Sequence, residues 1–147
     1  MKAYRNPVPT VDAIIQCSRS VLLVKRKKDP YKGLLALPGG FVNEGETVED
    51  AVIREVCEET SLEIHPIEIL GVYSDPNRDP RGHILSVVFI GIIVDGIPTA
   101  NDDAQEVQWV DIDKLDSYRI AFDHRLILYD YIVWKNNGGT FWTSKKR

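Results

Sequence analysis

The sequence predicts an α/β fold in which short strands alternate with two helices. Runs of β-branched and aliphatic residues, such as 11–17 and 21–26, have strand length and are separated by turn-forming residues. Two longer stretches, 47–60 and 122–134, carry apolar residues at helical spacing. At 147 residues, the chain has room for one domain with a sizeable core, so we expect a single domain over residues 1–147.

The expected elements follow one another along the chain. Residues 18–20 (Ser-Arg-Ser) favour a hairpin between the first two strands, and 27–33 is a polar loop with a proline and a glycine. After the first helix, we expect a strand at 67–74 and a loop at 75–82. A long apolar strand at 84–94 then ends at the turn pair Asp95-Gly96, and a further strand follows at 107–110.

The first helix has clear signals at its start. Thr47 is a favoured N-cap residue, and the acidic residues 49 and 50 fall in the first turn, where the helix dipole favours negative charge. An apolar stripe that can face a core is formed by Val48, Ala51, Val52 and Val56.

Three carboxylates gather near the end of this helix. Glu55, Glu58 and Glu59 are spaced at i, i+3 and i+4, so they project from one side of the helix. Glu55 neighbours the apolar stripe and should be partly buried. Because like charges at this spacing repel, we expect a positive partner, and a hard divalent cation prefers oxygen ligands. The alternative is a solvated acidic helix face.

The surrounding segment, residues 40–62, adds fixed positions to this cluster. The pattern places Gly40, Glu46, Arg54-Glu55 and Glu58-Glu59 at spacings that resemble the Nudix box, with one departure, Ser61 where the family has glycine. That glycine ends the helix, because it adopts the left-handed conformation at low cost. The resemblance implies a Nudix-type α/β/α sandwich with a mixed sheet between helices. It also implies hydrolysis of a nucleoside diphosphate linked to another moiety.

The resemblance assigns roles within the box. It implies that Glu55, Glu58 and Glu59 bind Mg²⁺, or alternatively Mn²⁺, with the carbonyl of Gly40 as a further ligand. Glu58 is also a candidate catalytic residue. Arg54 is counted with the catalytic residues as well, although its expected part is to pair with Glu46 and pin the loop to the helix. Gly39 would let the main chain approach the ions.

A second informative segment is the loop at 74–83. It carries Arg78 and Arg81, and arginine binds phosphate oxygens as a fork, so both are candidate substrate-binding residues. The alternative is a solvated loop in which Arg78 pairs with Asp79. Arg26, at the end of the second strand, is a further candidate for binding phosphate, with simple exposure as the alternative. The position of Pro76, together with residues 121–125 (Ala-Phe-Asp-His-Arg), resembles the short ADP-ribose pyrophosphatases.

The attacking water needs a base or an orienting group, which in the family is often an acid outside the box. Candidates are Asp102, Asp103 and Glu106, and we favour Glu106 because it shortly precedes Trp109-Val110. A solvated loop acid is the alternative. His124 is a further candidate base, but a packing role is the better expectation for a lone histidine near a helix start.

These resemblances lead to a functional hypothesis. It is the Mg²⁺-dependent hydrolysis of ADP-ribose to AMP and ribose 5-phosphate. The alternatives are hydrolysis of nucleoside triphosphates or dinucleoside polyphosphates, or a catalytically silent module that binds a nucleotide. Homodimerisation is expected from the subgroup, with a small-molecule nucleotide as substrate.

Composition bounds the remaining classes. Charged residues make up 27%, hydrophobic residues 44% and the net charge is −4, so we expect no nucleic-acid partner. No apolar run has membrane-spanning length and no signal peptide is visible, so we expect no membrane partner. The two cysteines are too few for a disulfide scaffold. We expect them to be buried or semi-buried in a reducing compartment, and the protein to be cytoplasmic.

Overall fold

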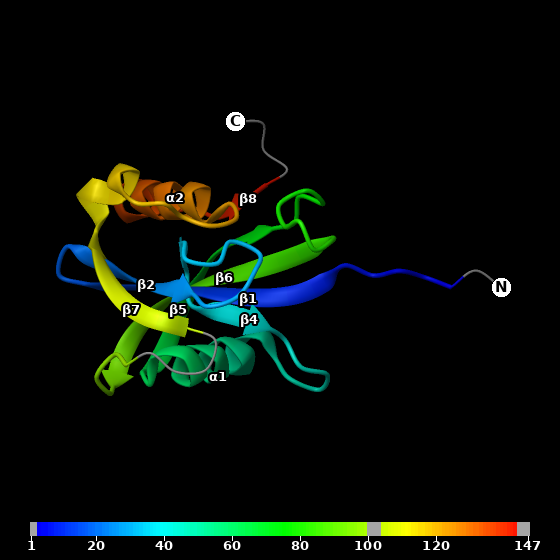
Figure 1. Ribbon diagram of the computed structural model, residues 1–147, viewed down its shortest axis with the longest axis horizontal. Helices are drawn as coiled ribbons and strands as arrows, with labels where there is room; N and C mark the ends of the chain where they lie inside the picture. The colour runs from blue at the N-terminus through cyan, green and yellow to red at the C-terminus, as the bar shows by residue number, and fades with distance from the viewer. Residues whose placement is uncertain (1–2, 100–103, 144–147) are drawn as a thin grey trace.

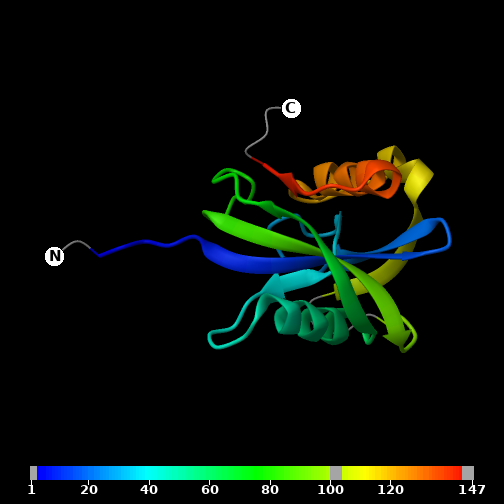
Figure 2. The same cartoon turned by 180° about the vertical axis from the view of Figure 1, so that it is seen from behind.

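A mixed β-sheet lies between two helices in the computed structural model, which describes residues 3–99 and 104–143. One face of the sheet carries α1 (Val48–Thr60) and the other carries α2 (His124–Asn137) (Figure 1). The reverse view shows the same three layers (Figure 2). The predicted α/β/α sandwich is therefore confirmed.

Eight strands are found within the described ranges. They are β1 (Val8–Cys17), β2 (Ser20–Arg26), β3 (Leu35–Ala36), β4 (Gly39–Phe41), β5 (Glu63–Tyr73), β6 (Ile84–Asp95), β7 (Ala104–Asp111) and β8 (Phe141–Trp142). A 3₁₀ helix, η1 (Ile112–Ser117), follows β7. The five longer strands and the first hairpin match the prediction, whereas three short strands, β3, β4 and β8, were not predicted.

β1 is the strand around which the site is built. It pairs antiparallel with β2 and parallel with β6, and the strand order is β3-β2-β1-β6-β5-β8. β4 also pairs with β1, aligning Gly40 with Val11 and Gly39 with Asp12. This pairing brings the start of the 40–62 segment onto the central strand.

Alternate residues of β1 face different cores, because side chains alternate across a strand. Val11, Ala13 and Ile15 belong to the core under α1, with the helix residues Ala51, Val52 and Val56. Ile14 belongs to the core under α2. By the same alternation, Asp12 points to the α2 side of the sheet.

Both ends of α1 are capped. The Thr47 side chain accepts the N–H of Asp50, as the N-cap prediction requires. Ser61 takes the glycine position with a left-handed φ of 64°, and its N–H donates to the carbonyl of Cys57. The helix end therefore keeps its geometry with serine, at the cost of a less favourable backbone conformation.

Two further expectations need comment. α2 begins at His124 rather than at 122, because Phe122 has a φ of 54° and cannot join the helix. The free thiols of Cys17 and Cys57 are exposed, so the expectation that they are buried was wrong. Within the described ranges, the helices are too short or too polar to cross a membrane.

Candidate active site

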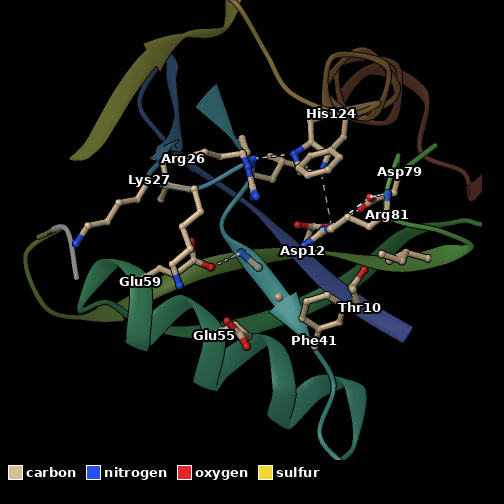
Figure 3. A pocket seen from close by; sticks show the side chains of 18 of the residues that line it. Thr10, Asp12, Arg26, Lys27, Phe41, Glu55, Glu59, Asp79, Arg81 and His124 are labelled. Atoms are coloured by element: carbon tan, nitrogen blue, oxygen red, sulfur yellow. Dashed lines mark hydrogen bonds and ion pairs between the residues drawn. The ribbon is translucent and has the colours of Figure 1, made fainter. Parts of the chain in front are cut away.

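A cleft of about 520 Å³ opens between α1, β4 and the start of α2. Glu55 and Glu59 lie along α1 on one side of it, whereas Arg26 and Arg81 lie on the opposite side (Figure 3). The cleft thus places carboxylates and guanidinium groups across one space, although they come from separate parts of the sequence. Its lining also includes Glu58 and Arg78, two further predicted charged side chains.

Arg54 holds the loop before α1 against the helix. Its Nε and Nη2 donate to the two carboxylate oxygens of Glu46 at 2.7 and 2.9 Å, which is the expected pairing. Nη2 also donates to the carbonyl of Phe41 at 2.9 Å, and Nη1 donates to Glu55 at 2.8 Å and to Glu58 at 3.2 Å. The hydrogen bonds from Arg54, with one from the N–H of Asn43, lower the pKa of Glu46 to about 2.

The carboxylates of Glu55 and Glu59 sit in a poorly solvated part of the cleft. Glu59 accepts the N–H of Gly39 at 3.0 Å, yet burial raises its pKa to about 8. Burial also raises the pKa of Glu55, whose side chain is 16% exposed, as the partial-burial prediction required. Glu58 is more open to solvent. A bound cation would remove the unfavourable desolvation of these charges.

Two glycines permit the close approach of β4 to its neighbours. A β-carbon on Gly40 would lie 2.4 Å from the carboxylate carbon of Glu55, and one on Gly39 would lie 2.1 Å from the carbonyl oxygen of Val11. Neither contact is sterically possible. A side chain at 39 would displace β4 from the backbone of β1, and one at 40 would push the Glu55 carboxylate out of its position. The main chain of Gly40 therefore lies directly against a predicted ligand.

The donor set fits a hard divalent cation, since Mg²⁺ prefers carboxylate and carbonyl oxygens. Glu55, Glu58, Glu59 and the carbonyl of Gly40 would hold it. In the described residues, no three acidic, histidine or cysteine side chains already form a complete ligand cluster. Glu55 and Glu58 share Arg54 instead, so their side chains would have to turn toward the ion.

A buried polar group lies behind the carboxylates, and sequence reasoning missed most of it. Asp12 accepts the hydroxyl of Ser86 at 2.6 Å, and burial raises the pKa of Asp12 to about 7. His124 Nε2 lies 3.8 Å from Asp12. An acidic residue inside an otherwise apolar strand was the available signal for Asp12.

His124 packs in this buried group as a neutral side chain. Its Nδ1 accepts the N–H of Leu37 at 2.9 Å, which assigns the ring proton to Nε2. Burial lowers the pKa of His124 to about 3. The structure therefore supports the packing role expected for His124 rather than that of a base.

The two arginines of the 74–83 loop are placed differently. Arg78 is 4% exposed and donates from Nε and Nη2 to both carboxylate oxygens of Asp123, at 2.8 and 2.6 Å. Arg81 is 38% exposed and pairs with Asp79, to which Nε and Nη2 donate at 3.1 and 2.8 Å. Both line the cleft, but Arg81 is the more open to a ligand.

The remaining predicted residues are at the edge of the site or outside the described structure. Arg26 lines the cleft, and its Nε donates to the carbonyl of Pro30 at 2.7 Å. Glu106 is exposed on β7 opposite Lys25, outside the described lining of the cleft. Its role in catalysis stays a prediction. Asp102 and Asp103 lie outside the described residues.

The fold and this cleft define the class of protein. The model of the Nudix domain matches residues 6–131, most of the chain. The chain therefore belongs to the Nudix family and is a Nudix hydrolase.

Two known proteins are similar to this one over most of its length. An ADP-ribose pyrophosphatase of Methanocaldococcus jannaschii is 50% identical over 135 residues, covering 92% of this chain and 79% of that protein. The Nudix domain of Shewanella oneidensis NrtR, solved in complex with ADP ribose, is 28% identical with a TM-score of 0.80, covering 88% and 89% of the two chains.

A second similar structure belongs to a longer protein. It is a bifunctional NMN adenylyltransferase/ADP ribose pyrophosphatase of Francisella tularensis, in complex with AMP and a manganese ion. It is 30% identical with a TM-score of 0.72, and the match covers 94% of this chain but 44% of that one.

Proposed function

We propose that this Nudix hydrolase cleaves ADP-ribose to AMP and ribose 5-phosphate, with Mg²⁺ as its cofactor and Mn²⁺ as the alternative ion. The observation that carries the proposal is the arrangement of charge across the cleft. Carboxylates suited to a divalent cation face Arg26 and Arg81, and a diphosphate carries the charge that fits between them. The 50% identity to an ADP-ribose pyrophosphatase supports the choice of substrate.

In this proposal, the chain's own residues bind and orient the substrate. Arg26 and Arg81 bind oxygens of the diphosphate, and Arg54 positions Glu55 and Glu58 through the hydrogen bonds described above. Glu55, Glu58, Glu59 and the Gly40 carbonyl hold the divalent ion, which supplies charge neutralisation and activates water when bound. Water supplies the oxygen that ends on one phosphate, and the other phosphate leaves as the second product.

The roles of two candidate residues, Glu106 and Arg78, need to be tested in solution. We propose that Glu106 orients or deprotonates the attacking water; on β7 it pairs with Lys25, the residue before the cleft-lining Arg26. We propose a structural role for Arg78, because its guanidinium is engaged by Asp123, and direct contact with substrate is the alternative. Glu106→Gln tests the first role, since unchanged turnover would remove Glu106 from the mechanism.

A substrate panel tests the proposed reaction. Purified protein with Mg²⁺ should release AMP from ADP-ribose faster than it hydrolyses a nucleoside triphosphate or a dinucleoside polyphosphate, as measured by chromatography of the nucleotide products. The Glu59→Gln variant should lose at least about a hundredfold in kcat, roughly 2.7 kcal/mol of transition-state stabilisation.

The alternatives predict other outcomes. Faster hydrolysis of the nucleoside triphosphate would show that the triphosphate, and not ADP-ribose, is the preferred substrate. Binding of ADP-ribose without turnover, in wild type and variant alike, would identify a silent nucleotide-binding module.

We further propose that the described ranges act as a single domain, because one sheet with a core on each face runs through them. We also propose a homodimer. Exposed apolar side chains concentrate along β5 and β6, where they offer area for a second copy, and the most exposed are Ile67, Ile92, Val94 and, just after β6, Ile97. A cytoplasmic location is proposed from the two exposed, free thiols, which suit a reducing compartment.

A further inference from the structure

The Phe122 ring contacts two of the arginines that line the cleft, Arg26 and Arg81. The guanidinium carbon of Arg26 is 4.9 Å from the centre of the Phe122 ring, and that of Arg81 is 5.6 Å from the same centre. Arg81 is also 5.3 Å from the ring centre of Phe41. Cation and ring therefore alternate in the order Arg26, Phe122, Arg81 and Phe41.

The backbone at Phe122 is held in an unfavourable conformation. Its φ of 54° lies in the left-handed region, which bulky side chains rarely adopt. Both neighbours are fixed: the N–H of Ala121 donates to the Leu35 carbonyl at 2.8 Å, and Asp123 binds Arg78. A strained residue in a ligand cleft is a reason to look for function.

A second strained aromatic residue supports the ring from outside. Tyr31, with a φ of 61°, packs edge-to-face on Phe122, with ring centres 4.8 Å apart and planes at 65°. The His124 ring also packs against Phe122, with ring centres 5.2 Å apart. Two rings therefore limit the positions that the Phe122 side chain can take.

A fixed ring in contact with two guanidinium groups can restrict both of them before an anion binds. Two like charges would otherwise spread apart when no anion is bound, and each flexible side chain would lose entropy on binding one. The ring faces attract both cations and restrict them beforehand. Arg26 is held further by the Pro30 carbonyl, and Arg81 by Asp79.

We propose that Phe122 is a positioning residue that holds Arg26 and Arg81 at the spacing needed to bind a diphosphate. This inference rests on the proposed function, because it concerns the substrate of the same site, and it adds a residue that sequence reasoning did not assign. Phe122 acts through the arginines and does not itself take part in the reaction.

Two substitutions separate the ring from its bulk. Phe122→Leu keeps an apolar side chain but removes the π face, and we expect KM for ADP-ribose to rise about tenfold with kcat within about twofold of wild type. That change corresponds to about 1.4 kcal/mol, within the range for cation–π contacts. Phe122→Tyr should restore KM to within about twofold. Tyr4→Leu, which changes an exposed aromatic residue away from the cleft, is the control and should match wild type.

A double-substitution cycle identifies the partner of the ring. In an Arg81→Met background, Phe122→Leu should raise KM only about threefold, because one of the two cations is already lost. An undiminished tenfold effect in that background would show that the ring acts independently of Arg81, and would overturn the proposal. Equal unfolding temperatures of the Leu and Tyr variants would show that both are folded.

Binding of inorganic pyrophosphate, measured by calorimetry, separates this proposal from the proposed function. Phe122→Leu should weaken that binding about tenfold, and Phe122→Tyr should not. If wild type releases no AMP from ADP-ribose while this pattern holds, the substrate assignment fails and the positioning role stands. If wild type does not bind pyrophosphate, or binds it no better than Phe122→Leu, the positioning role is overturned.

Discussion

In the buried side chains of the cleft, such as His124, burial shifts the pKa more than charged neighbours do. His124 illustrates this, because Leu37 donates to its Nδ1 and leaves the imidazole neutral in a buried site. Arg78 and Arg26 also disfavour its protonation, whereas Asp79 favours it, and Asp12 lies 3.8 Å from Nε2. The neutral ring is therefore a condition of the native packing.

This neutral imidazole predicts acid sensitivity. The unfolded chain binds a proton at this position below pH 6.5, whereas the folded chain binds it only near pH 3, so stability falls as the pH drops through 6.5. Between pH 7.5 and 5, His124 should cost about 2 kcal/mol.

The measurement is urea unfolding of wild type and His124→Asn at both pH values. Asparagine can still accept the Leu37 N–H but does not titrate in this range. The variant should lose about 2 kcal/mol less than wild type on acidification. Equal losses in the two proteins would show that His124 does not titrate as described.

At the scale of elements, a buried ion pair joins the loop between β5 and β6 to the start of α2. Arg78 and Asp123 are 45 residues apart, and their side chains are 4% and 16% exposed. The same contact ties Phe122, between Ala121 and Asp123, to the loop that carries Arg81. The loop that binds substrate in our proposal is thus anchored to a helix rather than left mobile.

Asp123→Asn should therefore destabilise the fold by about 3 kcal/mol, because it leaves the Arg78 charge buried without its partner. Replacing both residues, as Arg78→Met with Asp123→Leu, should cost less than Asp123→Asn alone. Urea unfolding at pH 7.5 measures both. Asp113→Asn, at an exposed pair with Arg19, is the control and should change stability by less than about 0.5 kcal/mol. A loss for Asp123→Asn no larger than for this control would mean that the Arg78–Asp123 pair adds nothing to stability.

The contrast between predicted and observed elements has a physical basis. The helix at 48–60 and the long strands were predictable, because apolar periodicity and the Thr47 cap are local signals. The pairing of Glu46 with Arg54 came with the box. The Arg78–Asp123 pair, the contact of His124 with Asp12, and the short strand β4 depend on residues that only the folded chain brings together, so local pattern did not reveal them.

At the scale of the whole molecule, the exposed apolar side chains of β5 and β6 are the surface that the proposed dimer would cover. Ile92→Asp combined with Val94→Asp should lower the sedimentation coefficient to that of a monomer, because charge would oppose burial of this surface. Sedimentation velocity at several protein concentrations is the measurement.

Tyr4→Asp, at another exposed position, is the matched control and should leave the association state unchanged. A wild-type protein that sediments as a monomer at all concentrations would exclude the homodimer. A dimer unaffected by the paired substitutions would place its interface on another surface.

The contacts of Arg54 have a consequence for how this sequence can vary over time. The Arg54 guanidinium donates hydrogen bonds to Glu46, Glu55, Glu58 and the carbonyl of Phe41. A change at one of these positions alters the partners available to the others, so their mutational effects are coupled rather than additive. Which residues can replace Glu46 or Glu58 therefore depends on whether Arg54 is present. The sequences of this loop and helix are expected to change together.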